Sequence, residues 1–368
     1  MKRVLFITNY ASPYRVCFYD ELAKYMDVTV LFSDRIEDKK HRSADWFISG
    51  QGRFHSVQLE RRVASFRGRD LCLDVKQWLN RKWDAIVVCG YAYPTTVLAM
   101  AYMRLHRIPF YMEVDGGLIR EDSGFKYRLK RTLVTMASGW ISSGRETTRY
   151  LVHYGAKAEA VSVYPFTSLW EKDIPSEAPG SQEKQQLRQK LGMEEKKILL
   201  YVGRFDPKKG MDDLLHICPR LDADTGIYFI GGEPSQEHLD FQQEHGLSHV
   251  HFVGFQKTQA LTEYYRAADL LVLPTKSDVW GLVINEAMAQ GLPVVTTDGC
   301  VAGVELVENG VNGYIVPVDD NEALTEAITK TLRADYRQMG RQALETIRPY
   351  TIENMAKAHV EIFSDGRK

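Results

Sequence analysis

The sequence has few cysteines and few long apolar runs, and both shortages restrict the class of protein. The five cysteines are dispersed over 368 residues without a Cys-x-x-Cys pair, which argues against a disulfide framework or a cysteine zinc site and favours the cytoplasm. A run of only four apolar residues ends at Thr8, too few for a signal peptide. Residues 85–103 carry no charge, but Gly90 and Pro94 divide them into a strand, a turn and a helix, so we expect no membrane span.

Motifs of several enzyme classes are also missing. No Gly-x-Gly-x-x-Gly follows a predicted strand, and there is no P-loop and no Gly-x-Ser-x-Gly. The Asp222-Ala-Asp224 triplet lies in a polar turn before a strand, and His249 and His251 have no third ligand nearby in the sequence. We therefore expect neither a metal nor a cofactor.

The formal net charge of −1 conceals two halves of opposite sign. Residues 1–170 hold 26 Lys and Arg against 17 Asp and Glu, whereas residues 171–368 hold 21 against 31. A basic amino-terminal half favours contact with anions such as lipid head groups. The alternative is that the two charged halves attract each other or simply keep the protein soluble.

Strand-length apolar runs alternate with helical periods along the whole chain, which predicts parallel sheets built from βα units in two domains. We place the domains at 1–170 and 187–350, with a linker in the polar stretch 168–192 and a helix at 351–368 that packs back on the first domain. The predicted strands are 4–8, 28–32, 85–89, 109–114, one beginning at 140, 160–164, 197–202, 225–230, 249–253, 270–273 and 293–297. The predicted helices are 13–25, 71–81, 94–107, 126–137, one ending at 153, 210–218, 237–245, 260–268, 282–290, 322–332, 336–345 and 351–363.

The strongest local signal is the segment 201–210, Tyr-Val-Gly-Arg-Phe-Asp-Pro-Lys-Lys-Gly, which joins a predicted strand to a predicted helix. A turn of this kind presents free amide groups and the positive end of a helix dipole, and Arg204 and Lys209 add two cations. The segment predicts a diphosphate-binding loop. A surface loop with ordinary basic residues is the alternative.

A second signal pairs two acids, Asp278 in a glycine-containing loop and Glu286 in the first turns of the following helix. Carboxylates accept paired hydrogen bonds from the adjacent hydroxyls of ribose or hexose, while loop amides before a helix face phosphate oxygens. The pair therefore suits a hydroxyl-rich ligand. Simple complementarity to the helix dipole remains the alternative for Glu286.

Together the two segments resemble the retaining glycosyltransferases of family 4, which have the GT-B fold. That family has Gly-Arg, four residues and Lys-Gly, then two acids eight positions apart and Ala-Met-Ala-x-Gly-x-Pro-Val-Val. This sequence has Gly203-Arg204 with Lys209-Gly210, and Asp278 with Glu286, which is followed by Ala-Met-Ala-Gln-Gly-Leu-Pro-Val-Val. The resemblance implies an α/β protein of GT-B fold, with two Rossmann-like βα domains facing a central cleft.

The resemblance also implies roles for individual residues. Arg204 and Lys209 would hold the donor diphosphate, Glu286 the ribose hydroxyls, and Asp278 the transferred sugar. Loop amides would cover the sugar and phosphates, and residues after a strand would line the base pocket. The donor-binding residues implied in this way are Gly203, Arg204, Lys209, Gly254, Phe255, Asp278, Trp280, Gly281, Leu282 and Glu286.

The sequence departs from the family pattern at two positions. The first acid of the pair is Asp278 rather than Glu, which places its carboxylate one methylene further back and leaves the donor sugar open. Many members have a His at the end of the fourth strand of the first domain, where this sequence has Asp115. Asp115 would orient an acceptor hydroxyl or stabilise positive charge on the sugar, unless it is a buried or capping carboxylate. With Arg204, Lys209 and Asp278, it completes the candidate catalytic residues.

Two further segments of the first half are candidates for ligand contacts. Asn9, Ser12 and Tyr14 lie in a loop between a strand and a helix, where the family meets donor phosphate or acceptor, although the loop is also an ordinary helix start. The helix around 126–133 combines four cations with apolar residues, as a membrane-surface helix would, or as a plain soluble surface does.

The sequence thus predicts a retaining enzyme that moves a hexose or N-acetylhexosamine from a nucleotide diphosphate sugar, with a UDP-sugar favoured on family grounds. The acceptor would be a glycan or a lipid-linked molecule in cell-surface polysaccharide biosynthesis, with no nucleic acid partner. We expect the cytoplasm, with contact at the inner face of an anionic membrane. The alternatives are a UDP-sugar 2-epimerase of the same fold, or a non-catalytic subunit that binds nucleotide sugars.

Overall fold

The computed structural model describes residues 1–34, 52–66, 68–80 and 82–364 in two compact units. The first unit comprises Met1–Thr167 with Tyr350–Lys368, and the second comprises Ser168–Pro349. The boundary therefore lies three residues before the predicted end of the first domain, and the carboxy-terminal helix is grouped with the first unit. The last four residues of the predicted helix 351–368 lie outside the described residues. No helix in the described ranges is long and apolar enough to span a membrane.

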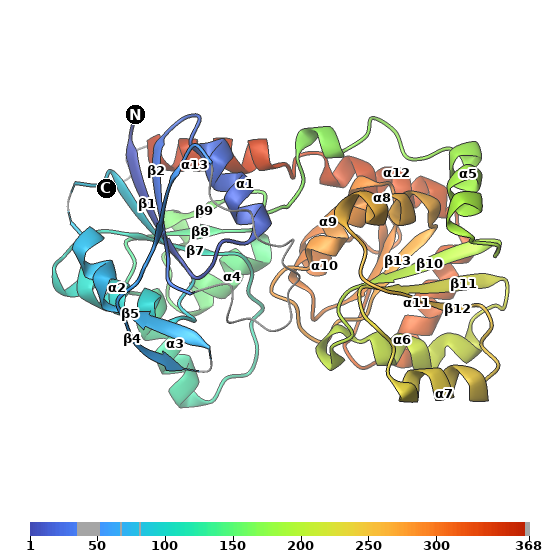
Figure 1. Ribbon diagram of the computed structural model, residues 1–368. Helices are drawn as coiled ribbons and strands as arrows, with labels where there is room; N and C mark the ends of the chain where they lie inside the picture. Colours follow the sequence, from blue (N-terminus) through green and yellow to red (C-terminus); the bar gives the residue numbers. More distant parts are fainter. Residues whose placement is uncertain (35–51, 67, 81, 365–368) are drawn as a thin grey trace. The chain divides into compact units, whose positions relative to one another are not determined.

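The first unit is built on a seven-stranded parallel sheet with the strand order β3-β2-β1-β6-β7-β8-β9 (Figure 1). A separate antiparallel hairpin, β4–β5, lies beside helix α2. The strands of this unit are β1(Arg3–Thr8), β2(Asp27–Phe32), β3(His55–Gln58), β4(Arg62–Phe66), β5(Arg69–Cys72), β6(Ala85–Cys89), β7(Tyr111–Val114), β8(Gly139–Ser142) and β9(Val161–Val163). Its helices are α1(Pro13–Leu22), α2(Pro94–Leu105), α3(Gly124–Val134), α4(Arg145–His153) and α13(Ile352–Ser364), with 3-10 helices η2(Leu73–Trp78) and η3(Ala158–Ala160).

The core of the first unit lies on both faces of this sheet, because its central strands β1 and β6 are largely apolar. Leu5 and Ile7 of β1 face a cluster built by α2, α3 and α4. Phe6, between them, turns to the other face, where its ring contacts Phe18 of α1 and Phe363 of α13. The carboxy-terminal helix therefore completes the core of the first unit by packing against α1.

The second unit has a six-stranded parallel sheet with the order β12-β11-β10-β13-β14-β15. Helices α8, α9 and α12 cover one face, and α6 and α11 the other (Figure 1). The strands are β10(Lys197–Val202), β11(Thr225–Ile230), β12(Val250–Val253), β13(Leu270–Leu273), β14(Val294–Thr297) and β15(Gly313–Val316). The helices are α5(Ser181–Leu191), α6(Met211–Ile217), α7(Gln236–Glu244), α8(Thr258–Ala267), α9(Leu282–Ala289), α10(Val301–Leu306), α11(Asn321–Arg333) and α12(Tyr336–Ile347), with 3-10 helices η4(Glu171–Asp173), η5(Pro207–Lys209) and η6(Cys218–Arg220).

Both sheets reverse their strand order next to their first strand, between β1 and β6 in one unit and between β10 and β13 in the other. In open α/β sheets, ligands bind outside the carboxyl ends of the strands at such a switch point, because the two connections leave the sheet on opposite faces. The loops after β1 and β6, and those after β10 and β13, are therefore the places to look for a site.

The structure corrects two sequence predictions of local structure. Residues 71–81 were predicted as one helix, but 71–72 end strand β5 and 73–78 form the 3-10 helix η2, while residue 81 lies outside the described residues. The polar stretch 168–192 contains helix α5, which buries no residue fully. That helix is fixed by charge, because Lys184 and Arg188 both bond to the buried Asp269, at 3.1 and 2.5 Å. Its composition therefore looks like that of a linker.

Candidate functional site

The loop after β10, residues 203–210, lies against the segment that follows β13. Gly210 has a φ of 70°, and a Cβ there would lie 1.9 Å from the Pro274 carbonyl oxygen, so only glycine fits. The Lys208 carbonyl accepts a hydrogen bond from the Thr275 hydroxyl at 2.9 Å and another from the Lys276 amide at 2.8 Å. Two loops that are far apart in the sequence are thus joined at the switch point of the second unit.

Lys209 and Asp278, which the sequence analysis assigns to the diphosphate and the sugar, form an ion pair across these loops. Their side chains are 20% and 19% exposed, so both remain accessible. Arg204 lies on the same loop but is 63% exposed, and its nearest carboxylate is Asp206, at 3.9 Å. The structure thus brings Lys209 and Asp278 together, and leaves the Arg204 guanidinium largely in solvent.

The turn before α9 is fixed by its own side chains. Gly281 caps the helix with a φ of 103°, and a Cβ there would lie 2.6 Å from the Cys300 sulfur. Trp280 is buried, and its indole N–H donates to the Asn285 side chain at 2.8 Å. These contacts hold the backbone of Trp280 and Gly281 where it enters α9 at Leu282. The positive end of the helix dipole lies at this point.

Glu286 lies in the second turn of α9, where its carboxylate has few partners. The Tyr265 hydroxyl donates to it at 3.1 Å and the Ser168 hydroxyl at 3.4 Å. Burial raises the pKa of Glu286 to about 7, and these two hydrogen bonds only partly offset that rise. The carboxyl group is therefore half protonated near neutral pH, and further hydroxyl donors would stabilise its ionised form.

Gly254 and Phe255 follow β12 at the edge of the same sheet. A Cβ at Gly254 would lie 2.8 Å from the Glu233 carboxylate, which belongs to the loop after β11. Phe255 leaves more than half of its surface exposed, as a ring available for stacking would. Its assignment to a base pocket stays a prediction.

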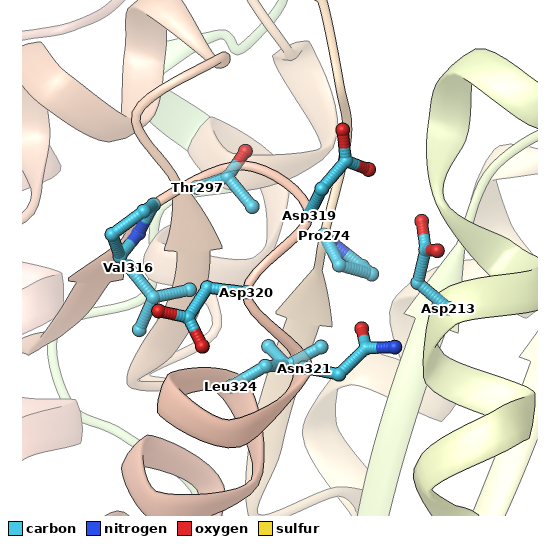
Figure 2. Close-up of a pocket in the computed structure, with 9 residues that line it drawn as sticks. Asp213, Pro274, Thr297, Val316, Asp319, Asp320, Asn321 and Leu324 are labelled. Atoms are coloured by element: carbon cyan, nitrogen blue, oxygen red, sulfur yellow. The ribbon is translucent and has the colours of Figure 1, made fainter.

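A small cavity lies beyond the joined loops, between α6 and the loop that enters α11 (Figure 2). It has a volume of about 10 Å³, enough for about one water molecule. Three carboxylates line it, from Asp213, Asp319 and Asp320, and Lys276 pairs with the first two at 3.2 and 2.6 Å. Its size and acidity do not suit a diphosphate.

In the first unit, Asp115 follows β7 and belongs to a buried network of charges. Arg15 of α1 is 5% exposed and bonds to two carboxylates, that of Glu113 at 2.5 Å and that of Asp115. The Tyr164 hydroxyl donates to both, to Asp115 at 3.0 Å and to Glu113 at 3.2 Å. Asp115 is thus a largely compensated carboxylate at the carboxyl edge of the sheet.

The carboxy-terminal helix adds a histidine to this network. His359 of α13 has no exposed surface, and its Nε2 lies 3.6 Å from Glu113, whose side chain is equally buried. Burial opposes ionisation of Glu113, but Arg15 and His359 lower its pKa to about 2. For Asp115 the balance is opposite, because burial and the neighbouring Glu113 raise its pKa more than Arg15 lowers it.

The loop after β1 holds the predicted Asn9 and Ser12, and Tyr14 is the second residue of α1. Asn9 accepts a hydrogen bond from the Tyr10 amide at 2.8 Å and bonds with the Tyr93 side chain after β6. Ser12 is buried, and Tyr14 packs edge-to-face against Phe166 at 5.5 Å between ring centroids. Burial raises the pKa of Tyr14. Asn9 therefore lies at the switch point, and the predicted ligand contacts of Ser12 and Tyr14 stay predictions.

The basic helix α3 presents both cations and apolar side chains. Lys126 and Lys130 are each 2.8 Å from the Asp122 carboxylate, so part of the positive charge is neutralised. Phe125 and Leu129 are exposed on the same helix. The weaker sequence candidates have structural roles, since His251 bonds to Glu195 and stacks on Tyr228, and Asp224 pairs with Lys196.

Sequence reasoning overlooked the residues that support Asp115 and Glu286. These supporting residues are Arg15, Glu113, Tyr164, Ser168, Tyr265 and His359. A charged residue inside an otherwise apolar strand was a usable signal for Glu113, which stands in Tyr-Met-Glu-Val. The others come from distant segments, and nothing local distinguishes them.

Comparisons with known proteins place the second unit in a family context. Residues 183–346 match the family described as Glycosyl transferases group 1. An uncharacterized glycosyltransferase of Methanocaldococcus jannaschii is 27% identical over 210 residues, 55% of this chain and 53% of that protein. A D-inositol 3-phosphate glycosyltransferase of Nocardia farcinica is 29% identical over 253 residues, 64% of this chain and 54% of that protein. The match thus spans about half the length of these curated relatives.

Solved structures resemble the whole chain. A sucrose-phosphate synthase from Thermosynechococcus elongatus has a TM-score of 0.75 with 19% identity over 99% of both chains. Anabaena HepE in complex with UDP and glucose has a TM-score of 0.73 with 19% identity, over 99% of this chain and 100% of that one. The likeness confirms the predicted α/β fold with two Rossmann-like domains. The family match to glycosyl transferases covers residues 183–346 of the second unit.

Proposed function

We propose that the protein is a retaining glycosyltransferase that moves a hexose or N-acetylhexosamine from a nucleotide diphosphate sugar, preferably a UDP-sugar, to a glycan or lipid-linked acceptor. The observation that carries this proposal is the contact between Lys209 and Asp278 at the switch point of the second unit. It joins a cation for phosphate and a carboxylate for sugar hydroxyls, beside the start of α9. The UDP bound in HepE supports the choice of base.

In this proposal Arg204, Lys209 and the amides at the start of α9 bind the diphosphate. The bond between the anomeric carbon and the diphosphate oxygen breaks, and its electron pair stays on the diphosphate, where these groups stabilise the developing charge. The acceptor hydroxyl oxygen then bonds to the anomeric carbon on the same face, and its proton passes to the departing diphosphate. The two cations neutralise this charge, so we propose that no metal or cofactor takes part.

Glu286 and Asp115 complete the assignment. Glu286 accepts hydrogen bonds from the ribose hydroxyls, which would stabilise its ionised form. We propose that Asp115 orients an acceptor hydroxyl or stabilises positive charge on the sugar, and Arg15 and Tyr164 hold its carboxylate in place. We further propose cell-surface polysaccharide biosynthesis at the inner face of an anionic membrane, supported by Phe125 and Leu129 beside the cations of α3.

The test begins with a panel of nucleotide sugars scored by thermal stabilisation, because a ligand that binds only the native state raises the melting temperature. With the best donor, Arg204→Ala and Lys209→Ala should each lower transfer by about 10²–10³-fold. Lys208→Ala is the control, since its side chain is exposed and its hydrogen bonds to Thr275 and Asp206 come from its backbone, which the substitution keeps. Unchanged turnover in both site variants would refute the diphosphate assignment.

The same assay separates the two alternatives. An epimerase would convert the donor sugar without any acceptor, whereas a transferase needs one. A binding subunit would hold the donor tightly and neither transfer nor hydrolyse it.

A further inference from the structure

The first unit contains a pocket of about 760 Å³, which is the size of a small-molecule site. It lies between the hairpin β4–β5 and the start of α2, and its wall is mostly apolar. Phe66 and Leu71 line it from the hairpin, and Val97 and Leu98 from the helix. A pocket with these walls favours an apolar group over a free sugar, because sugar hydroxyls would find few hydrogen-bond partners there.

The hairpin is held on α2 by hydrogen bonds, and Cys72 at the end of β5 also packs into the core of the first unit. The Thr95 hydroxyl of α2 donates to the Asp70 carbonyl at 2.7 Å and accepts from the Cys72 amide at 2.9 Å. These bonds fix β5, whereas Phe66 at the end of β4 leaves 60% of its surface exposed. The pocket therefore has one rigid wall and an aromatic rim that an apolar ligand would cover.

One end of the pocket is positively charged. Arg69 is its only charged lining residue among those the structure describes, and its guanidinium lies 5.1 Å from the centre of the Tyr93 ring. That guanidinium also donates to the Ala92 carbonyl at 2.8 Å, which keeps it at the mouth. Helix α2 begins at Pro94 in the same place, so its dipole adds partial positive charge. The lining thus suits an anionic group next to an apolar one.

The pocket is also adjacent to the candidate site of the first unit. Its segment 91–94 follows β6, which lies in the sheet between β1 and β7, the strands that carry Asn9 and Asp115 at their ends. Tyr93 lines the pocket and bonds with Asn9. A ligand in the pocket would therefore extend toward the carboxyl edge where an acceptor is expected.

We propose that this pocket binds an amphiphilic acceptor, with its apolar chain along Phe66, Val97 and Leu98 and its phosphate at Arg69 and the start of α2. The chemical class is an alkyl or isoprenyl phosphate ester whose head group carries the acceptor hydroxyl beyond the phosphate. That the ligand is the acceptor rests on the proposed function, whereas its binding does not. An uncharged amphiphile would contact the apolar wall but not Arg69, and a phosphate alone would contact Arg69 but leave the apolar wall uncovered.

The test is isothermal titration calorimetry of the full chain with octyl phosphate below its micelle-forming concentration. Octyl phosphate should bind with a negative heat-capacity change, which marks apolar burial. Octanol and inorganic phosphate should each bind at least about tenfold more weakly, because each lacks one of the two groups. Equal affinity for octanol would overturn the role of Arg69, and equal affinity for inorganic phosphate would overturn that of the apolar wall.

Two variants at the exposed rim test the location without disturbing the core. Phe66→Ser and Arg69→Met should each weaken octyl phosphate binding at least about fivefold. Their matched controls are Val63→Ser, an exposed residue of the same strand that does not line the pocket, and Arg104→Met, an exposed cation of α2 outside it. Both controls should bind within twofold of the unchanged protein. Site variants that bind like their controls would overturn the pocket assignment.

A blocking variant gives a second readout. Val97→Trp should abolish octyl phosphate binding, with folding checked by its melting temperature, and Leu105→Trp, at an exposed position of the same helix, should not. Because calorimetry uses no donor, the two proposals fail separately. Absence of octyl phosphate binding with sugar transfer intact overturns the pocket alone, whereas normal binding without transfer to any acceptor overturns the proposed function alone.

Discussion

The two sheets share one strand order: the first strand is central, the next two are added on one side of it, and the fourth returns to its other side. The charged residues at their carboxyl edges nevertheless differ in burial and in the number of their partners. In the first unit, Arg15 is almost fully buried between two carboxylates. In the second, Lys209 faces one carboxylate and is partly exposed, and Arg204 is largely in solvent. A buried cation that is paired with two carboxylates stabilises the fold, whereas partly exposed cations remain able to bind an anion.

The glutamates of the two units show the same contrast. Glu113 and Glu286 are both buried carboxylates, but Arg15 and His359 keep the pKa of Glu113 at about 2, whereas burial without a cation raises that of Glu286 to about 7. A buried charge costs free energy unless it is paired. Glu286 therefore reduces the stability of the fold when it ionises, which is expected of a group kept for binding.

The largest effect should follow from removing the cation of the first unit. Arg15→Met removes the arginine that both Glu113 and Asp115 pair with and should destabilise that unit by about 3–5 kcal/mol. Amide hydrogen exchange read by mass spectrometry would locate the loss, with faster exchange in β1 and β7 and unchanged exchange in β10 and β13.

The control for Arg15 is Arg149→Met, which removes an exposed arginine paired with Glu146 at 3.1 Å. An exposed pair within one helix contributes about 0.3–0.5 kcal/mol, so this variant should hardly differ from the unchanged protein. Equal losses in the two variants would mean that the buried network does not hold the first unit together.

Most of the strands and the two joined loops of the second unit were predictable from the sequence, because they depend on the local order of apolar, polar and glycine residues. Most parallel strands follow from apolar runs such as 197–202 and 225–230, and the joining of Lys209 to Asp278 is consistent with loops predicted after two strands. The loops lie side by side because β10 and β13 are neighbours in the sheet, and the resemblance to family 4 had already indicated both loops as donor-binding segments.

Other features depend on contacts that no local pattern encodes. Helix α5 lacked an apolar stripe because its ion pairs with Asp269 replace burial. Only the end of β5, Leu71 and Cys72, was merged into the predicted helix 71–81, because the strand is short and its partner strand is exposed. The pairing of Arg15 with Glu113 and Asp115 spans about a hundred residues, so only the tertiary structure reveals it.

The contrast between the two glutamates should also appear in the pH dependence of the free energy of unfolding. The pKa of Glu286 in the folded state, about 7, lies above its value of 4.5 in the unfolded chain, so the folded state binds more protons between these values and loses stability as pH rises through them. Glu286→Gln removes this loss. The variant should therefore gain on the order of 1–3 kcal/mol relative to the unchanged protein at pH 8, and little at pH 4.

Denaturation of the variant and the unchanged protein across this pH range measures the difference in their free energies of unfolding. Hydrogen exchange in α9 then shows whether the difference lies at that helix. Glu326→Gln, at an exposed position of α11, is the control and should show no such trend. The Glu286→Gln variant should also bind the donor more weakly at pH 8, since the neutral amide is a poorer acceptor for ribose hydroxyls. A variant that is less stable than the unchanged protein at pH 8 would contradict the assigned burial effect.

The smallest effect should come from deleting one hydroxyl in each unit. Tyr164 donates to two carboxylates in the first unit, and Tyr265 donates to Glu286 alone in the second. Tyr164→Phe should therefore cost about 1.5–3 kcal/mol, the range for hydrogen bonds to charged groups. Tyr265→Phe should cost about 1 kcal/mol or less at pH 6, where Glu286 is mostly protonated, and more at pH 8, where the hydroxyl bonds to an ionised carboxylate. Exchange rates in β7 and α9 report the two losses separately, and a pH-independent loss at Tyr265 would show that Glu286 does not titrate near neutrality.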